Sequence, residues 1–194
     1  MTTNIAIIGT GNVGSALARG LTRARHNVRS IGEDKAAVRE AAEWADVVIL
    51  AVPFGALPDV ATTIAQAAEG KTVIDVTNAL TADMTLALGF TTSGAEALQM
   101  QLPGARVVKA FNTQFAQHMD SGRLRDQRLT TFVAGDDAAA KRTVLDLASS
   151  IGFDAIDAGP LANARLLEPL GFLNIQLGYV LGLGTQIGLQ LIRA

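Results

Sequence analysis

The chain alternates between short apolar runs and longer segments in which apolar residues recur at helical spacing. Residues 46–52 (DVVILAV) form a nearly continuous apolar run, which is typical of a parallel strand buried on both faces. Residues 137–151 have the pattern of a helix. The same patterns predict further strands at 4–8, 27–31, 71–76, 106–110, 129–134 and 153–157, and further helices at 13–24, 34–42 and 57–68.

Strands that alternate with helices predict βαβ units and a parallel sheet. Because crossovers between parallel strands are right-handed, we expect an α/β fold with a doubly wound, Rossmann-type sheet. The 194 residues contain no linker, repeat or low-complexity stretch, so one dinucleotide-binding domain over 1–194 is expected, with a long C-terminal helix over 161–192. The segment 77–92 has little regular pattern and is expected to be a functional loop.

Composition narrows the class of protein further. The net charge of −2, without long blocks of like charge, gives no electrostatic footprint for nucleic acid. The absence of cysteine excludes a disulfide framework and a thiolate metal site, and we expect no metal and a cytoplasmic location. The N-terminus lacks the pattern of a signal peptide. Residues 170–192 approach the length of a membrane span, but their Asn and Gln side chains favour a buried or interface helix without membrane insertion.

The segment 7–21 (IIGTGNVGSALARGL) places three glycines between a predicted strand and a predicted helix. This context favours a dinucleotide-binding loop, since a bare GxGxxG match is a weak signal by itself. Gly9 would allow the tight turn, Gly11 would let the backbone approach a pyrophosphate, and Gly14 would let the helix pack close to the strand. The first amides of the helix would then point at the phosphates, and Thr10 and Asn12 would add hydrogen bonds.

The choice between NAD and NADP depends on the end of the second predicted strand. Glu33 lies 19 residues beyond Gly14, where an acidic residue usually binds the ribose 2′-hydroxyl and repels a 2′-phosphate. A second interpretation is that Glu33 and Asp34 only start the next helix, where acidic residues suit the helix dipole. Arg29 or Lys35 would then reach a phosphate.

Short segments follow three more predicted strands, and two of these segments are polar. Because ligands bind at the carboxyl ends of such strands, these residues are candidates for the rest of the site. Pro53 and Phe54 are placed to pack beside the nicotinamide ribose. The others offer hydrogen bonds but no strong acid or base, and the ring-positioning candidates among them are Thr77, Asn78 and Asn112, with Thr113 beside them.

Other residues with chemical potential are weaker candidates. His26 precedes the second strand and is expected to be structural or solvated, and His118 is a minor candidate for the site. Lys109 is expected to reach solvent at a strand end, and Trp44 to belong to the core. A site with hydrogen-bonding groups and no evident proton donor suits hydride transfer to another conjugated cofactor, for which the protein mainly positions two rings.

Six motifs together resemble the family of coenzyme F420-dependent NADP oxidoreductases, and the chain is similar to the reductase domain of the six-transmembrane epithelial metalloreductases. The resemblance covers nearly the whole chain. The last motif is the most specific, because a generic Rossmann domain does not require Pro160, Asn163, Arg165, Glu168 and Pro169 at these spacings. The motifs are GTGNVG, AVPF, DVTNAL, GFTTSGAEALQ, LPGARVVKAFNT and DAGPLANARLLEPLGFLNIQLGY.

The resemblance implies a homodimer in which a nicotinamide lies in the crevice and a deazaflavin or flavin, such as coenzyme F420 or FMN, stacks on it for direct hydride transfer. It implies that the C-terminal helix closes the pocket and builds the dimer. Carried over by motif, the pyrophosphate would lie at Thr10, Gly11, Asn12 and Val13. The nicotinamide half would lie along Val52, Pro53 and Phe54, with Thr77 and Asn78 near the reacting ring.

One departure concerns the cofactor. The family commonly has Gly-Ser-Arg at the end of the second strand, where the serine and arginine grip the 2′-phosphate, whereas this chain has Ile31-Gly32-Glu33. Glu33 stands in place of the arginine, so the cofactor is NADP or NAD with a slight preference for NAD, held at the ribose by Gly32, Glu33 and Lys35.

Two alternatives remain open. The first is a non-catalytic NAD(P)-binding sensor or a partner subunit, which would bind the dinucleotide tightly without turnover. The second is a small imine, pyrroline or hydroxyacid reductase. Such enzymes usually carry an additional helical domain, and few residues follow the last predicted strand here.

Overall fold

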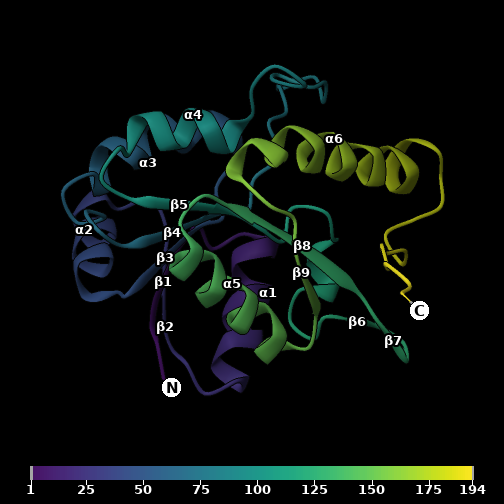
Figure 1. Cartoon of the computed structure of the whole chain (residues 1–194), viewed down its shortest axis with the longest axis horizontal. Helices are drawn as coiled ribbons and strands as arrows, with labels where there is room; N and C mark the ends of the chain where they lie inside the picture. The colour runs from purple at the N-terminus through teal and green to yellow at the C-terminus, as the bar shows by residue number, and fades with distance from the viewer. Residues whose placement is uncertain (1, 194) are drawn as a thin grey trace.

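A seven-stranded sheet organises the computed structural model, which describes residues 2–193. The strand order is β2-β1-β3-β4-β5-β8-β9 (Figure 1). A separate small hairpin pairs β6 with β7. The strands are β1 (Asn4–Ile8), β2 (Asn27–Ile31), β3 (Val47–Leu50), β4 (Thr72–Asp75), β5 (Arg106–Lys109), β6 (Arg123–Leu124), β7 (Gln127–Arg128), β8 (Thr130–Gly135) and β9 (Asp154–Asp157).

The direction of the strands confirms the Rossmann-like α/β class, with one difference. Strands β1 to β5 pair in parallel, but β8 pairs antiparallel with β5, and β9 runs parallel to β8. The reason lies in the connection from β5 to β8. It contains a short 3₁₀ turn at Ala116–His118 and the β6–β7 hairpin in place of a crossover helix. The chain therefore re-enters the sheet in the opposite direction.

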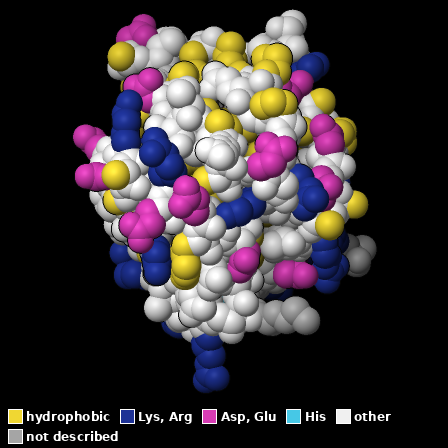
Figure 2. Space-filling view, turned by 90° about the vertical axis from the view of Figure 1, so that its left-hand side faces the viewer, with side chains coloured by type: hydrophobic (Ala, Val, Ile, Leu, Met, Phe, Trp, Pro, Cys, Tyr) yellow, Lys and Arg dark blue, Asp and Glu magenta, His cyan; other side chains and the backbone are white. Residues whose placement is uncertain are grey.

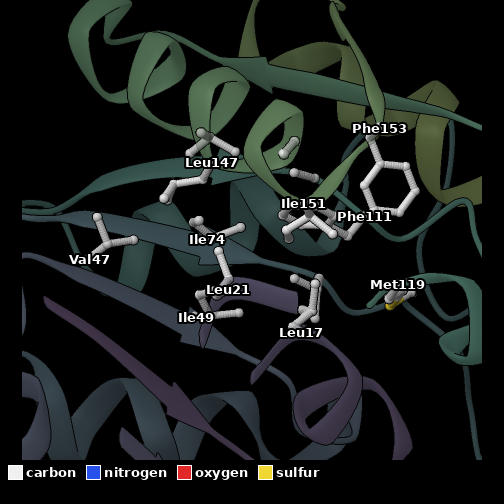
Figure 3. Close-up of a cluster of buried hydrophobic side chains, with 14 of the residues drawn as sticks. Leu17, Leu21, Val47, Ile49, Ile74, Phe111, Met119, Leu147, Ile151 and Phe153 are labelled. Atoms are coloured by element: carbon white, nitrogen blue, oxygen red, sulfur yellow. The ribbon is translucent and has the colours of Figure 1, made fainter. Parts of the chain in front are cut away.

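Helices cover both faces of the sheet. Apolar residues of α1 (Asn12–Arg23) and α5 (Ala138–Ile151) form one buried cluster with the strands, and Figure 3 shows Leu17 and Leu21 of α1 opposite Leu147 and Ile151 of α5. A second cluster lies on the other face. Its helices are α2 (Lys35–Trp44), α3 (Leu57–Ile64) and α4 (Gly94–Gln101).

The helix α4 is missing from the sequence-based assignment of elements. It begins with a capping box, in which the Ser93 hydroxyl accepts a hydrogen bond from the Glu96 N–H at 3.2 Å and donates one to the Glu96 carboxylate at 2.7 Å. Arg165 also binds this carboxylate, with its closest contact at 2.6 Å. The Arg165 hydrogen bond lowers the pKa of Glu96, and the Ser93 hydroxyl adds to the effect against the opposing effect of burial.

The expected C-terminal helix over 161–192 is wrong at its end. A 3₁₀ turn at Leu161–Asn163 leads into α6 (Ala164–Ile175) and a π-helical segment at Gln176–Val180 (η4), where the helix stops. Gly182 and Gly184 have φ of +76° and +72°, which ends the helical path. Residues 181–193 then fold back, and the Thr130 N–H donates to the Leu189 carbonyl at 2.9 Å. Within residues 2–193, no helix is both long and apolar enough to cross a membrane.

Candidate functional site

The carboxyl ends of five strands are aligned across the sheet. Pairing in register joins Ile31 to Ile8, Ile8 to Leu50, Leu50 to Asp75, and Asp75 to Lys109. The loops that follow these residues therefore start along one edge. Strand β2 lies on one side of β1 and β3 on the other, so the strand order reverses there. Ligands of open α/β sheets bind at the carboxyl edge beside such a reversal.

Two of the three loop glycines are required by packing. Gly9 has φ of +115°, and a Cβ placed on it would overlap the carbonyl oxygen of Ala51 at the end of β3. A Cβ on Gly14 would overlap the carbonyl oxygen of Gly9. The Gly9 N–H donates to the Ile31 carbonyl at 2.8 Å, which ties the loop to β2 as well. These contacts hold the start of α1 tightly against the sheet.

Gly11 has a different role. A Cβ at this position would meet no atom of the described chain within 4 Å, and Gly11 caps α1 without a side-chain hydrogen bond. The first N–H groups of a helix carry a partial positive charge and need acceptors. The backbone at Gly11 is therefore open to an anionic group of a ligand.

Two cavities meet at this loop. The first, about 470 Å³, lies toward β2, α2 and α3, and the second, about 420 Å³, lies toward the end of β4. Both are lined by Gly11, Ala51, Val52 and Pro53, so they lie next to each other on the two sides of these residues. The first is also lined by Gly9, Thr10, Gly32, Glu33 and Lys35, and the second by Asn12, Val13, Phe54, Thr77 and Asn78.

The cavities thus bring together most residues expected at a cofactor, and the exceptions are Gly14, Arg29, Asn112 and Thr113. Gly14 lines neither cavity and serves helix packing, as its spacing predicts. Asn112 also lines neither and lies behind Asn78. Sequence reasoning missed other wall residues, although the helix that follows Pro53 and Phe54 would have indicated some of them. They are Asp59, Val60 and Thr63 of α3 in the first cavity and Leu80, Thr81, Met84 and Ile175 in the second.

Charged side chains at the first cavity are few. Asp34 is the cap of α2, where its carboxylate accepts the Ala37 N–H at 2.8 Å, and Glu33 is exposed on the cavity wall. Asp59 adds a second carboxylate and Lys35 one ammonium group. Over the face shown in Figure 2, acidic and basic side chains are intermingled and form no large patch of one sign.

Arg29 does not line the first cavity and instead contacts Trp44 and Glu40. Its guanidinium carbon lies 4.2 Å from the centre of the Trp44 ring, in a cation–π contact, and Nη1 is 3.9 Å from the Glu40 carboxylate. Trp44 itself is half-buried and packs against the core cluster of that face. Lys35 is therefore the cation at the first cavity.

Hydrogen bonds fix the end of β4 at the second cavity. Asn78 Nδ2 donates to the Asn112 carbonyl at 3.1 Å, and Asn112 Nδ2 donates to Asn78 Oδ1 at 2.9 Å and to the Leu167 carbonyl at 2.8 Å. Asn112 therefore orients Asn78. The buried hydroxyl of Thr77 has no partner in the described chain, and neither has that of Thr113. An orphaned hydroxyl on a residue of the cavity wall fits a ligand that brings a polar group.

The expectation that Lys109 reaches solvent is wrong. Its side chain is fully buried, and its ammonium lies 2.8 Å from both the Asp75 and the Glu168 carboxylates. Burial by itself lowers the pKa of Lys109, but the attraction of these two carboxylates outweighs it and raises the pKa above its ordinary value. The sequence could not show this partner set, because Glu168 belongs to α6.

The histidines lie elsewhere. His118 is buried with Nε2 3.1 Å from the Thr185 carbonyl oxygen, and His26 lies within 3.4 Å of the Thr3 N–H and the Ser150 hydroxyl. Neither lines either cavity. The side chains that line the two cavities thus offer hydrogen-bonding groups and apolar surface, but no imidazole.

The glycine loop at the strand reversal and the adjacent cavities on both sides of it define a Rossmann-type dinucleotide-binding protein. A family model described as NADP oxidoreductase coenzyme F420-dependent matches residues 4–38 and 32–79. A crystal structure from Arthrobacter sp. FB24, provisionally assigned as an F420-dependent NADP reductase, is 30% identical with a TM-score of 0.90, over 98% of this chain and 100% of that one. The chain belongs to the family of coenzyme F420-dependent NADP oxidoreductases.

Two curated relatives are similar over part of their length. The F420-dependent NADP reductase of Methanocaldococcus jannaschii is 34% identical over 139 residues, which are 68% of this chain and 61% of the reductase. Metalloreductase STEAP3 of Rattus norvegicus is 35% identical over 108 residues, which are 56% of this chain and 21% of the metalloreductase. The chain therefore spans less than two thirds of either relative.

The different roles of Gly14, which allows close packing, and Gly11, which leaves the backbone open, predict different effects of the same substitution. Gly14→Ala forces a Cβ into the Gly9 carbonyl, and we expect it to lower the free energy of unfolding by about 1–3 kcal/mol, as overpacking does. Gly11→Ala adds the same methyl group to open space, and we expect a smaller loss, of at most about 1 kcal/mol, because alanine is a poorer helix cap than glycine. Urea denaturation measures both. Equal losses of stability would contradict this division of roles.

Proposed function

We propose that this protein is an oxidoreductase that binds NAD or NADP across the two cavities and transfers a hydride between the nicotinamide and a deazaflavin or flavin acceptor, such as coenzyme F420 or FMN. The observation that carries the proposal is the pair of adjacent cavities on both sides of Gly11, lined by the residues that the motifs predict. Membership of the family supports the same activity.

The chain has a suitable group for each part of the dinucleotide. The N–H groups after Gly11, with Thr10, Asn12 and Val13, would hold the pyrophosphate. Gly32, Glu33 and Lys35 would contact the adenosine ribose. Val52, Pro53 and Phe54 would lie along the nicotinamide half, where the Thr77 hydroxyl would find a partner in the ring's amide group and Asn78 would contact the ring.

When bound, the nicotinamide supplies or accepts the hydride. The residues of this chain would position the two rings and exclude water from between them, since ring-to-ring transfer depends on the alignment of the two reacting carbons. Asn112 contributes by orienting Asn78. We assign the acceptor ring to the apolar end of the second cavity at Leu80, Met84 and Ile175. The cysteine-free chain agrees with a reducing cytoplasm, where we place the protein.

Hydride transfer is tested by adding F420 or FMN to the reduced dinucleotide complex. We expect the near-ultraviolet absorbance of the reduced nicotinamide to disappear in proportion to the acceptor reduced. Thr77→Val keeps the shape of the side chain and removes its hydroxyl, so we expect slower transfer with this variant. Tight dinucleotide binding without oxidation by either acceptor would overturn the proposal and favour a non-catalytic sensor or partner subunit.

The acidic character of the first cavity favours NAD. We expect NADH to bind about tenfold more tightly than NADPH, because Glu33 accepts ribose hydroxyls and repels a 2′-phosphate. Glu33→Arg should reverse the preference, as titrations followed by nicotinamide fluorescence would show. Glu43→Arg, on the same side of the protein, makes the same change of charge away from the cavity and should leave the preference unchanged. Tighter binding of NADPH by the wild type would assign the phosphate to Lys35 and leave Glu33 without a selective role.

We also propose that the protein is a homodimer, formed through α6 and the segment after it. Leu166, Leu173 and Val180 recur every seven residues on one face of the helix and are 62%, 53% and 66% exposed. Apolar residues in such a row usually mark an interface, and a second copy of the chain is the partner that the family resemblance implies.

Light scattering with size-exclusion chromatography tests this assembly. We expect a dimer for the wild type and a monomer for Leu173→Glu, because the new carboxylate would be desolvated at the interface. Met100→Glu is the control, since Met100 is 75% exposed on α4 and the variant should stay dimeric. A monomeric wild type would contradict the proposal.

A further inference from the structure

A buried cluster of three charged residues lies behind the second cavity. It consists of Lys109 on β5, Asp75 on β4 and Glu168 on α6, and we call it the buried charge cluster. These side chains are 0%, 0% and 1% exposed and line neither cavity. Since burying charges costs free energy that hydrophobic side chains of similar size would not, the cluster needs an explanation beyond stability.

The cluster holds both backbone polar groups of Thr77. Asp75 Oδ1 accepts the Thr77 N–H at 2.8 Å, and Lys109 Nζ donates to the Thr77 carbonyl at 2.6 Å. Asp75 and Lys109 are partners in register across β4 and β5, so the strands fix the position of the pair. The orientation of Thr77 on the cavity wall therefore depends on two buried charges.

The same cluster reaches the opposite wall of the cavity. Glu168 accepts the Gly94 N–H at 2.9 Å and the Ala95 N–H at 3.2 Å, which anchors the first residues of α4. A Cβ on Gly94 would lie 2.8 Å from Phe54 Cε2, so α4 packs directly on the Phe54 ring. Thr77 and Phe54 line the second cavity, and one network of contacts supports both.

All four carboxylate oxygens of the cluster are used by donors. Each oxygen of Asp75 and of Glu168 faces an N–H donor, from Lys109, Thr77, Gly94 or Ala95. The arrangement is therefore specific for one ammonium between two carboxylates, and replacing any member alters the geometry of the others.

We propose that the buried charge cluster positions Thr77 and Phe54 for the nicotinamide half of the dinucleotide, so that Lys109 is a positioning residue for a ring that it does not touch. This inference rests on the proposed function. The cluster supports the second cavity and not the first. In the described chain, the residues that line the first cavity away from Gly11 make no hydrogen bond or ion pair to the buried charge cluster.

Comparison of NADH with ADP-ribose, which lacks the nicotinamide, tests this separation. In Lys109→Met we expect NADH affinity to fall about tenfold, the equivalent of one charged hydrogen bond, while ADP-ribose affinity changes by less than about twofold. Calorimetry measures both affinities. Emission of bound NADH reports the ring environment separately, and should shift toward that of free NADH. If the wild type prefers NADPH, the matched pair is NADPH and its 2′-phosphorylated ADP-ribose.

A double-mutant cycle shows whether Lys109 acts through Thr77. Thr77→Val and Lys109→Met should each weaken the binding of NADH. The double variant should lose little more NADH affinity than the single variant that binds NADH more weakly. Additive losses would overturn the positioning role. Leu147→Ala is the control for a general loss of stability, because Leu147 is buried on the opposite face of the sheet and should leave the ratio of the two affinities unchanged.

The outcomes separate this inference from the proposed function. Equal loss of NADH and ADP-ribose affinity in Lys109→Met would reduce the cluster to a structural element and leave the proposed function intact. A wild type that binds NADH no more tightly than ADP-ribose would overturn both. Circular dichroism establishes whether Lys109→Met folds. If it does not, Glu168→Gln, which keeps the side-chain shape, must shift the same affinity ratio in the same direction, and an unchanged ratio rejects the proposal.

Discussion

The close approach of the β1–α1 loop to the end of β3 is the constraint on which the site depends. Gly9 and Gly14 allow backbone to lie against backbone at this point, where side chains would keep the segments apart. Helix α1 can therefore begin at the edge of the sheet with its N-terminus beside Ala51 and Val52. Because the two cavities share these residues, the same contact determines where they meet.

The two cavities are built differently. The wall near Glu33 and Lys35 is exposed and carries a small number of charged side chains. The wall near Thr77 is supported by buried polar groups on β4, β5 and α6, in which each contact depends on its neighbours. A site of this kind can alter its preference for a dinucleotide without disturbing the geometry in which a ring is held.

The sequence was most informative where local chemistry decides the structure. The sheet edge was predicted from the glycines, the apolar strands and the polar residues after them. The same signals predicted several wall residues, the first of which is Gly9 and the last Asn78. Lys109 was misjudged because an apolar neighbourhood in sequence does not show that Asp75 and Glu168 approach it in space. Helix α4 carried a visible signal in Ser93 and Glu96, whereas the reversal of β8 and the role of Asn112 depend on tertiary contacts that no local pattern encodes.

Helix α6 connects the properties of the site with those of the surface. Its buried side carries Glu168 and the Leu167 carbonyl, which hold Lys109 and Asn112, and its exposed side carries Leu166 and Leu173. Residues only one or two positions apart thus contact the buried polar groups behind Thr77 on one side and face the outer surface on the other. Helix α6 therefore contributes both to the buried support of Thr77 and to the exposed apolar row.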